Sequence, residues 1–477
     1  MNHEFGIDFG TTNSACVGIL DKRKIFKYTD SEDEPFPSVV MIDKVTGEVI
    51  CGREAWNKRQ ELSESCEIFT SIKSHLGTGQ TWQIAGKMWT PEMIASQIFL
   101  GLKKQVMAIS GKHVKFDSAV VAVPVGFSSE KRKSLRKAAS LAGIHIKSFV
   151  SESTAAVFHS YEKIKPFSKV AVFDWGGGTL DISILENNKG TIKELAVGNE
   201  FLGGDDIDLK LAKYVHLKLE KENPGNISFE DMPARFRDLM IARCESAKKE
   251  FTYKDVVNIR MNRYGDYGTV SININYQEFS RLIQPEINRA IECLQSTLRK
   301  VHMNIENLGC ILLVGGSVKL RPFIEKVEAS WNCYKVYPEE SDWSVSYGAA
   351  QLSIQEGQYI LADSVGVLLS NGSFYPIAKA GTPLNRLNTA ASFAIVEDTD
   401  TAHFIFTESD GNVLEYVHVP TFGFFQEQVD VKLTVDENQV FKFLARSRKR
   451  SDKYSVEWHF TSPKLIYQLP VEYMNRE

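Results

Sequence analysis

The stretch that most constrains this chain is Phe173–Asp181, which reads FDWGGGTLD. Three consecutive glycines stand between two acids, inside an apolar segment that runs from VAV to ISIL. A glycine-rich turn lets backbone N–H groups approach an anion without a Cβ in the way. A carboxylate beside a polyphosphate is repelled unless a divalent cation lies between them. The pattern therefore predicts a turn built for phosphate and a metal ion.

The same pattern occurs near the N-terminus. FGIDFGTTNSACVGIL (5–20) and VFDWGGGTLDISIL (172–185) each run from an apolar strand through Asp, a bulky residue and a Gly-rich turn with Thr into a second strand. This repetition predicts a duplicated α/β domain that closes on a cleft, with Asp8 and Asp174 beside Mg²⁺. An ordinary tight hairpin also favours Gly and Asp. Two matched copies, however, favour the hypothesis that the turns bind phosphate. The chain has no GxxxxGK[ST] phosphate loop.

Composition narrows the classes of partner. The chain has 477 residues, 43% hydrophobic and 24% charged, which is typical of a soluble protein of two or three domains. Its formal charge of −4 provides no general attraction for nucleic acid or an acidic membrane surface. Seven scattered cysteines without a CxxC argue against a disulfide framework or a zinc cluster. Because there is no basic-then-apolar leader and no long apolar run, we expect a cytoplasmic monomer.

The secondary structure expected from the sequence changes near residue 360. Before it, strand runs alternate with helices; one helix is expected to start after Ser128, its N-cap, and to end before Gly143. After it, strands with alternating polarity dominate, such as the run 429–435 followed by a DEN turn. We expect an α/β domain over 1–355, a linker over 356–365 and a β-sandwich over 366–477. The basic run ARSRKRSDK (445–453) is interpreted as a solvated loop rather than a nucleic-acid patch.

Eight blocks carry a resemblance to a known family, and they follow one another in that family's order: GIDFGTTNS, VAVPVGF, SESTAAV, FDWGGGTLDISIL, LGGDDID, CESAKKE, LLVGGSVKLRPF and SYGAA. Over nearly its whole length the chain resembles the 70-kDa heat-shock (DnaK-like) chaperones. The resemblance implies an actin-like (ribonuclease H-like) duplicated ATPase domain followed by a small β-sandwich. It also implies ATP/ADP and Mg²⁺ as cofactors, slow ATP hydrolysis, unfolded or extended polypeptide as ligand, and J-domain and nucleotide-exchange proteins as further partners.

The resemblance assigns roles to individual residues. Asp8 and Asp174 match the family's magnesium-side acids. The residues matching its catalytic group are Lys73, Glu152, Asp174, Thr179 and Asp181. The phosphate cradle falls on Gly10, Thr11, Thr12, Asn13, Gly176, Gly177, Gly178, Gly203 and Gly204. The adenosine side falls on Glu245, Lys248, Lys249, Gly315, Gly316, Ser317, Lys319 and Asp342. A lysine near the reacting phosphate makes sense, since hydrolysis needs cationic stabilisation and a positioned water.

Several positions depart from the family's pattern. Lys319 stands where an arginine usually stacks on adenine, so we expect weaker nucleotide binding. Ser153 replaces a proline tied to signalling between domains, which predicts weak coupling between nucleotide state and polypeptide affinity. Asn13 and Gly126 replace aromatic residues. The sequence stops soon after the β-rich part, so we expect a shortened member without the helical lid and with fast polypeptide release.

Two other functions remain open. The first alternative is a nucleotide-binding regulatory or adaptor protein that has a vestigial ATPase and one dedicated protein partner. A small-molecule kinase of the same superfold is also conceivable, since fold alone does not fix function. It is disfavoured because Lys73, Glu152 and Asp181 together suit water rather than a substrate hydroxyl, and because the β-rich tail has no place in a sugar kinase.

Overall fold

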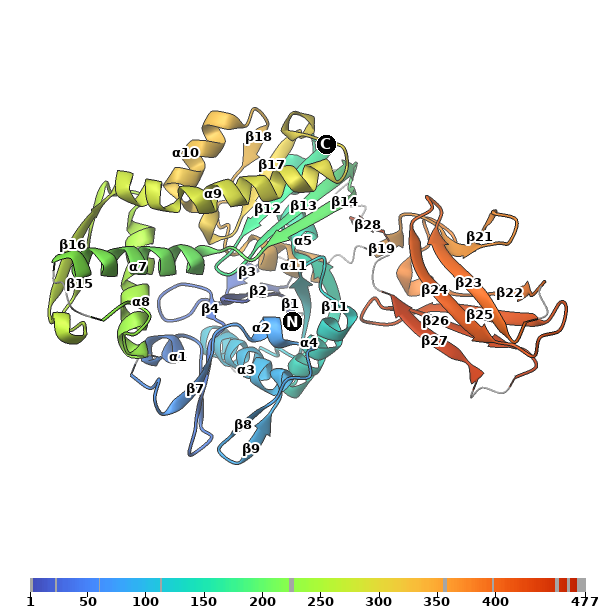
Figure 1. Ribbon diagram of the computed structural model, residues 1–477, viewed down its shortest axis with the longest axis horizontal. Helices are drawn as coiled ribbons and strands as arrows, with labels where there is room; N and C mark the ends of the chain where they lie inside the picture. Colours follow the sequence, from blue (N-terminus) through green and yellow to red (C-terminus); the bar gives the residue numbers. More distant parts are fainter. Residues whose placement is uncertain are drawn as a thin grey trace. The chain divides into compact units, whose positions relative to one another are not determined.

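Each glycine-turn hairpin lies inside a larger β-sheet (Figure 1). The first sheet has the order β11-β10-β1-β2-β3, with β4 also paired to β2. Its strands are β1 (His3–Phe9), β2 (Asn13–Leu20), β3 (Lys24–Lys27), β4 (Phe36–Pro37), β10 (Ser118–Val123) and β11 (His145–Ser151). The second sheet has the order β18-β17-β12-β13-β14-β28-β19. Its strands are β12 (Lys169–Trp175), β13 (Leu180–Asn188), β14 (Thr191–Glu200), β17 (Cys310–Val314), β18 (Tyr334–Val336), β19 (Gln358–Leu361) and β28 (Leu465–Gln468).

The two sheets use their leading strands in the same way. β1 is parallel to β10, which is parallel to β11, and β12 is parallel to β17, which is parallel to β18. Asp8 is the last residue but one of β1, and Asp174 is the last but one of β12. Both acids therefore stand at the carboxyl end of a strand that has a parallel neighbour, and ligands bind at such ends in open α/β sheets.

The computed structural model describes residues 3–21, 24–59, 61–111, 114–222, 227–354, 358–396, 399–450, 454–460 and 464–469. It divides into two compact units. The first comprises 1–126, 134–185 and 195–354, and the second comprises 127–133, 186–194 and 355–477.

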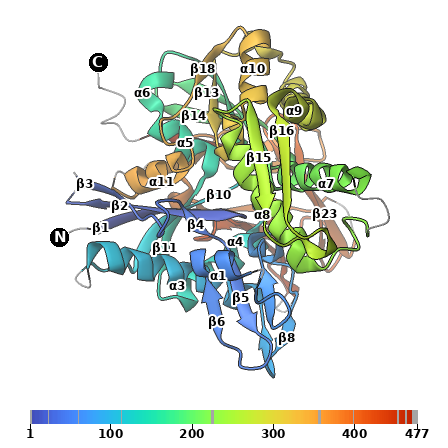
Figure 2. The ribbon, with the colours of Figure 1, turned by 90° about the vertical axis from the view of Figure 1, so that its left-hand side faces the viewer.

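Helices accompany the sheets of the first unit. They are α1 (Arg53–Lys58), α2 (Ile72–His75), α3 (Pro91–Ser110), α4 (Ser129–Leu141), α5 (Glu152–His159), α6 (Tyr161–Ile164), α7 (Gly204–Glu222), α8 (Ala234–Glu250), α9 (Tyr276–Arg299), α10 (Arg321–Ser330) and α11 (Ser344–Ile354). Helix α11 packs against β1 and α5 (Figure 2). Ser128 Oγ accepts from the N–H of Lys131 (3.3 Å), and Gly143 has φ +68°, so the predicted boundaries of α4 are confirmed.

Smaller sheets complete this unit. They are β6-β5-β7, β8-β9 and β15-β16, formed by β5 (Val40–Asp43), β6 (Val49–Cys51), β7 (Cys66–Phe69), β8 (Trp82–Ile84), β9 (Lys87–Trp89), β15 (Val256–Met261) and β16 (Val270–Asn275). All seven cysteines are free thiols. Among the residues that the structure describes, no helix combines the length and apolarity needed to cross a bilayer.

Two four-stranded sheets form a sandwich in the second unit. One has the order β21-β20-β23-β24 and the other β22-β25-β26-β27. The strands are β20 (Val365–Leu368), β21 (Phe374–Ala378), β22 (Asn388–Ala394), β23 (Thr401–Glu408), β24 (Val413–Pro420), β25 (Gln428–Val435), β26 (Phe441–Ser447) and β27 (Val456–Phe460). Trp458 stacks on Phe443, and Phe406 packs against both rings in the shared core. The predicted alternation buries Val429, Val431 and Leu433.

The last described strand returns to the segment 186–194 of the same unit. β28 pairs antiparallel with β14 at Thr191–Lys193 and, on its other side, with β19. β19 occupies part of the predicted linker 356–365, whose residues 356 and 357 lie outside the described residues. The linker sequence ILAD therefore begins inside a paired strand.

Candidate functional site

Charged side chains from five elements of the first unit interact electrostatically with one another. They are Asp8 of β1, Lys73 of α2, Glu152 of α5, Asp174 of β12 and Asp181 of β13. Lys73 Nζ donates to Glu152 Oε1 at 2.9 Å, and Lys73 is only 7% exposed. A lysine is almost never buried unless it is paired. The structure thus brings together acids and a lysine that the sequence scatters over some 170 residues.

The partly buried acids of this cluster are short of positive charge. Burial, with the charge of Glu152 adding to it, raises the pKa of Asp8 to about 7 and that of Asp181 to about 6. Burial and the surrounding acids raise the pKa of Asp174 well above its usual value. Lys73 opposes these shifts but is a single cation. A divalent cation beside Asp8 and Asp174 would relieve the excess charge, so the residues fit Mg²⁺.

The donor set matches magnesium in another respect. Within the described ranges, no group of three or more His, Cys, Asp or Glu side chains is arranged to hold a metal ion unaided. Mg²⁺ is usually held by one or two carboxylates together with waters and substrate phosphates. Two acids beside a phosphate cradle would satisfy that requirement.

The glycine turns lie against one another without room for side chains. A Cβ on Gly177 would lie 2.5 Å from Thr12 Oγ1, and a Cβ on Gly203 would lie 1.9 Å from the carbonyl oxygen of Gly177. The N–H of Gly204 donates to the carbonyl oxygen of Gly176 at 3.1 Å. The loops 10–13, 176–179 and 203–204 therefore form one contiguous backbone surface, as a phosphate cradle requires.

The remaining cradle residues shape these turns. In the first hairpin, a Cβ on Gly10 would lie 2.0 Å from the carbonyl oxygen of Asn13. In the second, the N–H of Gly176 donates to the carbonyl oxygen of Thr179 (3.0 Å), which closes the turn, and Thr179 hydrogen-bonds Asp181. Across the hairpins, Thr11 Cγ2 would lie 3.7 Å from a Cβ on Gly178. All nine predicted cradle residues thus belong to this surface.

The predicted adenosine side begins next to the cradle. Ser317 Oγ donates to the carbonyl oxygen of Gly176 at 2.8 Å. Gly315 has φ +86°, and a Cβ there would lie 2.9 Å from Asp174 Oδ1. Lys319 Nζ donates to Asp342 Oδ2 at 2.5 Å while half of its side chain remains exposed. Gly316 lies against Asp342, since a Cβ there would be 3.3 Å from Asp342 Oδ1.

The three predicted adenosine-side residues of α8 form two separate sets of contacts. Lys249 pairs with Glu245 of its own helix at 3.1 Å. Lys248 instead donates to Asp208 Oδ2 (2.7 Å) and to the carbonyl oxygen of Gly204 (3.0 Å). Lys248 therefore connects the loop at Gly204 to Asp208 of α7. The Glu245–Lys249 pair is more exposed to solvent than Lys248.

Two acids of α7 escaped the sequence analysis. Thr12 Oγ1 donates to Asp205 Oδ2 (3.3 Å), and burial raises the pKa of Asp205 to about 6. Burial likewise raises the pKa of Asp208 to about 7, against the opposing charge of Lys248, and Asp208 Oδ1 has no hydrogen-bond partner among the described residues. Both belong to the block LGGDDID, where acids three apart at a helix start were the available signal.

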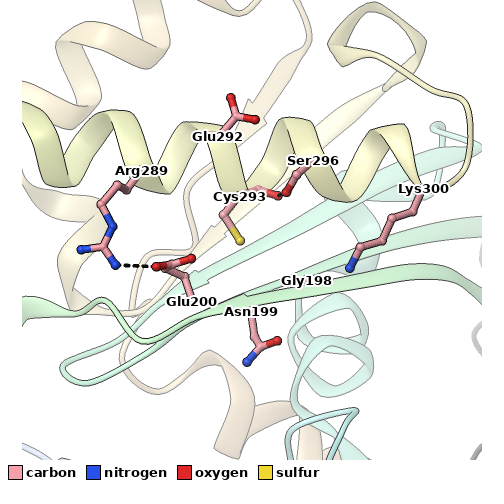
Figure 3. Close-up of a pocket in the computed structure, with 8 residues that line it drawn as sticks. All are labelled: Gly198, Asn199, Glu200, Arg289, Glu292, Cys293, Ser296 and Lys300. Carbon is pink, nitrogen blue, oxygen red and sulfur yellow. Dashed lines mark hydrogen bonds and ion pairs between the residues drawn. The ribbon is translucent and has the colours of Figure 1, made fainter.

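A cavity of about 230 Å³ lies elsewhere in the first unit, between α9 and the end of β14 (Figure 3). Its lining consists of Gly198, Asn199, Glu200, Arg289, Glu292, Cys293, Ser296 and Lys300. Arg289 pairs with Glu200 in the cavity wall. Burial raises the pKa of Cys293 to about 11, so this thiol stays protonated at neutral pH. None of the predicted site residues lines this cavity.

The family model described as Hsp70 protein matches residues 78–402, which is more than half of the 477-residue chain. The matched segment contains Glu152, the second glycine turn and the predicted adenosine side. Together with the ordered sequence blocks, this match shows that the chain belongs to the Hsp70 family, whose members are ATP-binding, chaperone-like proteins with an actin-like ATPase fold.

Proposed function

We propose that this chain is a chaperone-like ATPase that binds Mg-ATP in the cradle, hydrolyses it slowly, and binds extended or unfolded polypeptide through its C-terminal β-sandwich. The division proposed is a duplicated ATPase domain over 1–355, a linker over 356–365 and the sandwich over 366–477. The shared strand order of the two large sheets supports the duplication. The observation that carries the proposal is the buried Lys73–Glu152 pair beside Asp8, Asp174 and Asp181.

Each residue of the cluster has a chemical task in this proposal. Asp8 and Asp174 would hold Mg²⁺, which would offset the charge of the phosphates. Lys73 would stabilise charge on the transferred phosphoryl group, and Glu152 fixes the lysine in place. Asp181 is largely ionised at neutral pH, so it can accept a hydrogen bond from the attacking water and orient it. The backbone N–H groups of the glycine turns would bind the phosphates.

Phosphate release tests this proposal most directly. We expect the full chain to hydrolyse ATP only with Mg²⁺, and Lys73→Ala to lower turnover about 100-fold. Lys319→Ala serves as a comparison, because it lies on the adenosine side and should weaken binding rather than turnover. Absence of Mg²⁺-dependent nucleotide binding would overturn the site assignment.

An adaptor role is the second candidate. The observation that favours it is Lys319, which stands in place of a stacking arginine and is tied to Asp342. A lysine lacks the planar guanidinium, so adenine stacking is weaker. Tight binding of one protein partner, with nucleotide bound but no turnover, would select this role over an active ATPase.

A further inference from the structure

Strand β24 forms an edge of its sheet in the sandwich. Within the residues described, the order β21-β20-β23-β24 ends at this strand, which pairs with β23 alone. The N–H of Tyr416 in this strand donates to the carboxylate of Glu415 at 3.2 Å. The open side of β24 therefore carries backbone groups that another strand can pair with.

An exposed aromatic loop follows this edge directly. Phe422, Phe424 and Phe425 are 56%, 41% and 61% exposed, and Gly423 turns the chain with φ +76°. The loop is anchored, because the N–H of Phe422 donates to the Glu427 carboxylate at 2.8 Å. Contiguous exposed apolar side chains on a fixed loop indicate an interaction surface.

Cations accompany the rings. The Arg450 guanidinium lies 4.4 Å from the centroid of the Phe422 ring, and Lys449 Nζ lies 5.5 Å from that of Phe424. Lys449 is exposed and, in the part of the chain that the structure describes, forms no ion pair. The neighbouring acid Glu427 is buried and already accepts from Phe422 and Ser447.

A second neighbouring acid is also engaged. Asp430 is bound by Arg448, at 2.9 Å from its nearer oxygen. Asp400 is exposed and accepts from Thr401 Oγ1 at 3.2 Å. Lys449 is therefore the cation of this surface that is most available to an acidic ligand.

We propose that β24 and the loop 421–425 form a docking surface for an extended polypeptide segment with an acidic side chain. The segment would add to β24 as a further strand, place apolar side chains on the three phenylalanine rings and direct its carboxylate toward Lys449. Pro420 has no N–H, so strand addition ends where the aromatic loop begins. The inference rests on the proposed polypeptide binding and assigns it a surface and a preference.

A polypeptide suits this surface better than a bilayer or a nucleic acid. Unpaired N–H and C=O groups along a strand are matched only by another backbone. The formal charge of −4 also provides no general attraction for anionic polymers or lipids. The rings and the strand edge together therefore select an extended peptide.

The test uses the full chain and fluorescence anisotropy with a short labelled peptide of alternating valine and threonine that contains one glutamate. We expect Phe424→Ser/Phe425→Ser to weaken its binding about tenfold. Tyr375→Ser is the matched control, because Tyr375 lies on β21, the opposite edge strand of the same sheet, and is 45% exposed. It should bind normally. Thermal melts of both variants verify folding.

Two further probes distinguish the contribution of backbone pairing with β24 from that of the Lys449 charge. The same peptide with alternate backbone amides N-methylated should not bind, since it cannot pair with an edge. Lys449→Glu should reverse the preference between the glutamate peptide and a lysine counterpart.

The outcomes are distinguishable. Peptide binding that the double phenylalanine variant leaves unchanged overturns the docking surface but leaves the proposed function standing. Failure of the wild-type chain to bind any peptide, including a generic unfolded one, overturns both. Binding of phosphatidylserine vesicles or a single-stranded oligonucleotide in place of peptide, lost in the double variant, would assign the surface to another ligand and refute the inference.

Discussion

Replacing Asp8 by Asn should stabilise the nucleotide-free protein while weakening its response to Mg-ATP. Asp8 is partly buried, and its pKa is raised from 3.8 to about 7 by burial and by Glu152. At about pH 8 the folded chain must hold this carboxylate ionised, at a cost of roughly 4 kcal/mol, because each pH unit of such a rise corresponds to about 1.4 kcal/mol. Asparagine has nearly the same shape and no charge, so it removes much of that cost.

The pH dependence gives the sign of the effect. Below about pH 3 Asp8 is protonated in both the folded and the unfolded chain, so its charge costs nothing. As pH rises toward 7, the unfolded chain releases its proton first, and the stability of the wild-type protein falls. The advantage of Asp8→Asn should therefore be largest at about pH 8 and shrink steadily toward pH 4.

Differential scanning calorimetry measures both predicted effects. Runs with EDTA give the stability of the metal-free protein, and runs with Mg²⁺ and ATP give the stabilisation by Mg-ATP. We expect a melting temperature several degrees above wild type without metal at about pH 8, and a clearly smaller rise on adding Mg-ATP. Asp33→Asn is the control, because Asp33 is exposed and has φ 62°, which asparagine also tolerates. A destabilised metal-free variant, or an unchanged response to Mg-ATP, would refute the reasoning.

Four further substitutions test other parts of the structure. Lys73→Ala should lower ATP turnover about 100-fold while nucleotide affinity changes little; in single-turnover assays, loss of affinity alone would contradict this. Lys319→Arg should tighten ADP binding about threefold by adding a planar cation, and calorimetric titration showing no gain would remove the stacking argument. Ser153→Pro, tolerated in the first turn of α5, should increase the ratio of peptide affinities between the ADP and ATP states, which we expect to be below tenfold in wild type; equal ratios in peptide titrations would reject that role. Trp175→Phe should cost about 1–3 kcal/mol in denaturant unfolding, because the buried Leu202 carbonyl oxygen loses its donor at 3.1 Å; an unchanged midpoint would show that water replaces it.

The structural features that were predicted correctly from the sequence depend on local chemistry. The N-cap at Ser128 and the left-handed Gly143 follow from neighbouring residues, and both were predictable. The alternation of Val429, Val431 and Leu433 likewise fixes which face of β25 is buried. These features depend on bonds and contacts within a few residues.

Contacts between residues far apart in the sequence could not be predicted from local patterns. Lys73 and Glu152 are 79 residues apart, and no spacing rule joins them; the resemblance to a family did. Neither periodicity nor resemblance identified Asp205 and Asp208. Asp208 is buried, which raises its pKa, whereas Asp205 is exposed and contacts Thr12 of the first glycine turn. Burial is a property of the packed structure, so it cannot be read from a linear pattern.

The sequence alone determined the two glycine hairpins with their acids and the change from α/β to β-rich structure, because turn chemistry and side-chain periodicity act over short distances. Only the tertiary structure decided that Lys248 braces the cradle through Asp208 and Gly204, and that β28 lies between β14 and β19. Such contacts depend on how whole elements pack, and many different partners would satisfy the same local pattern.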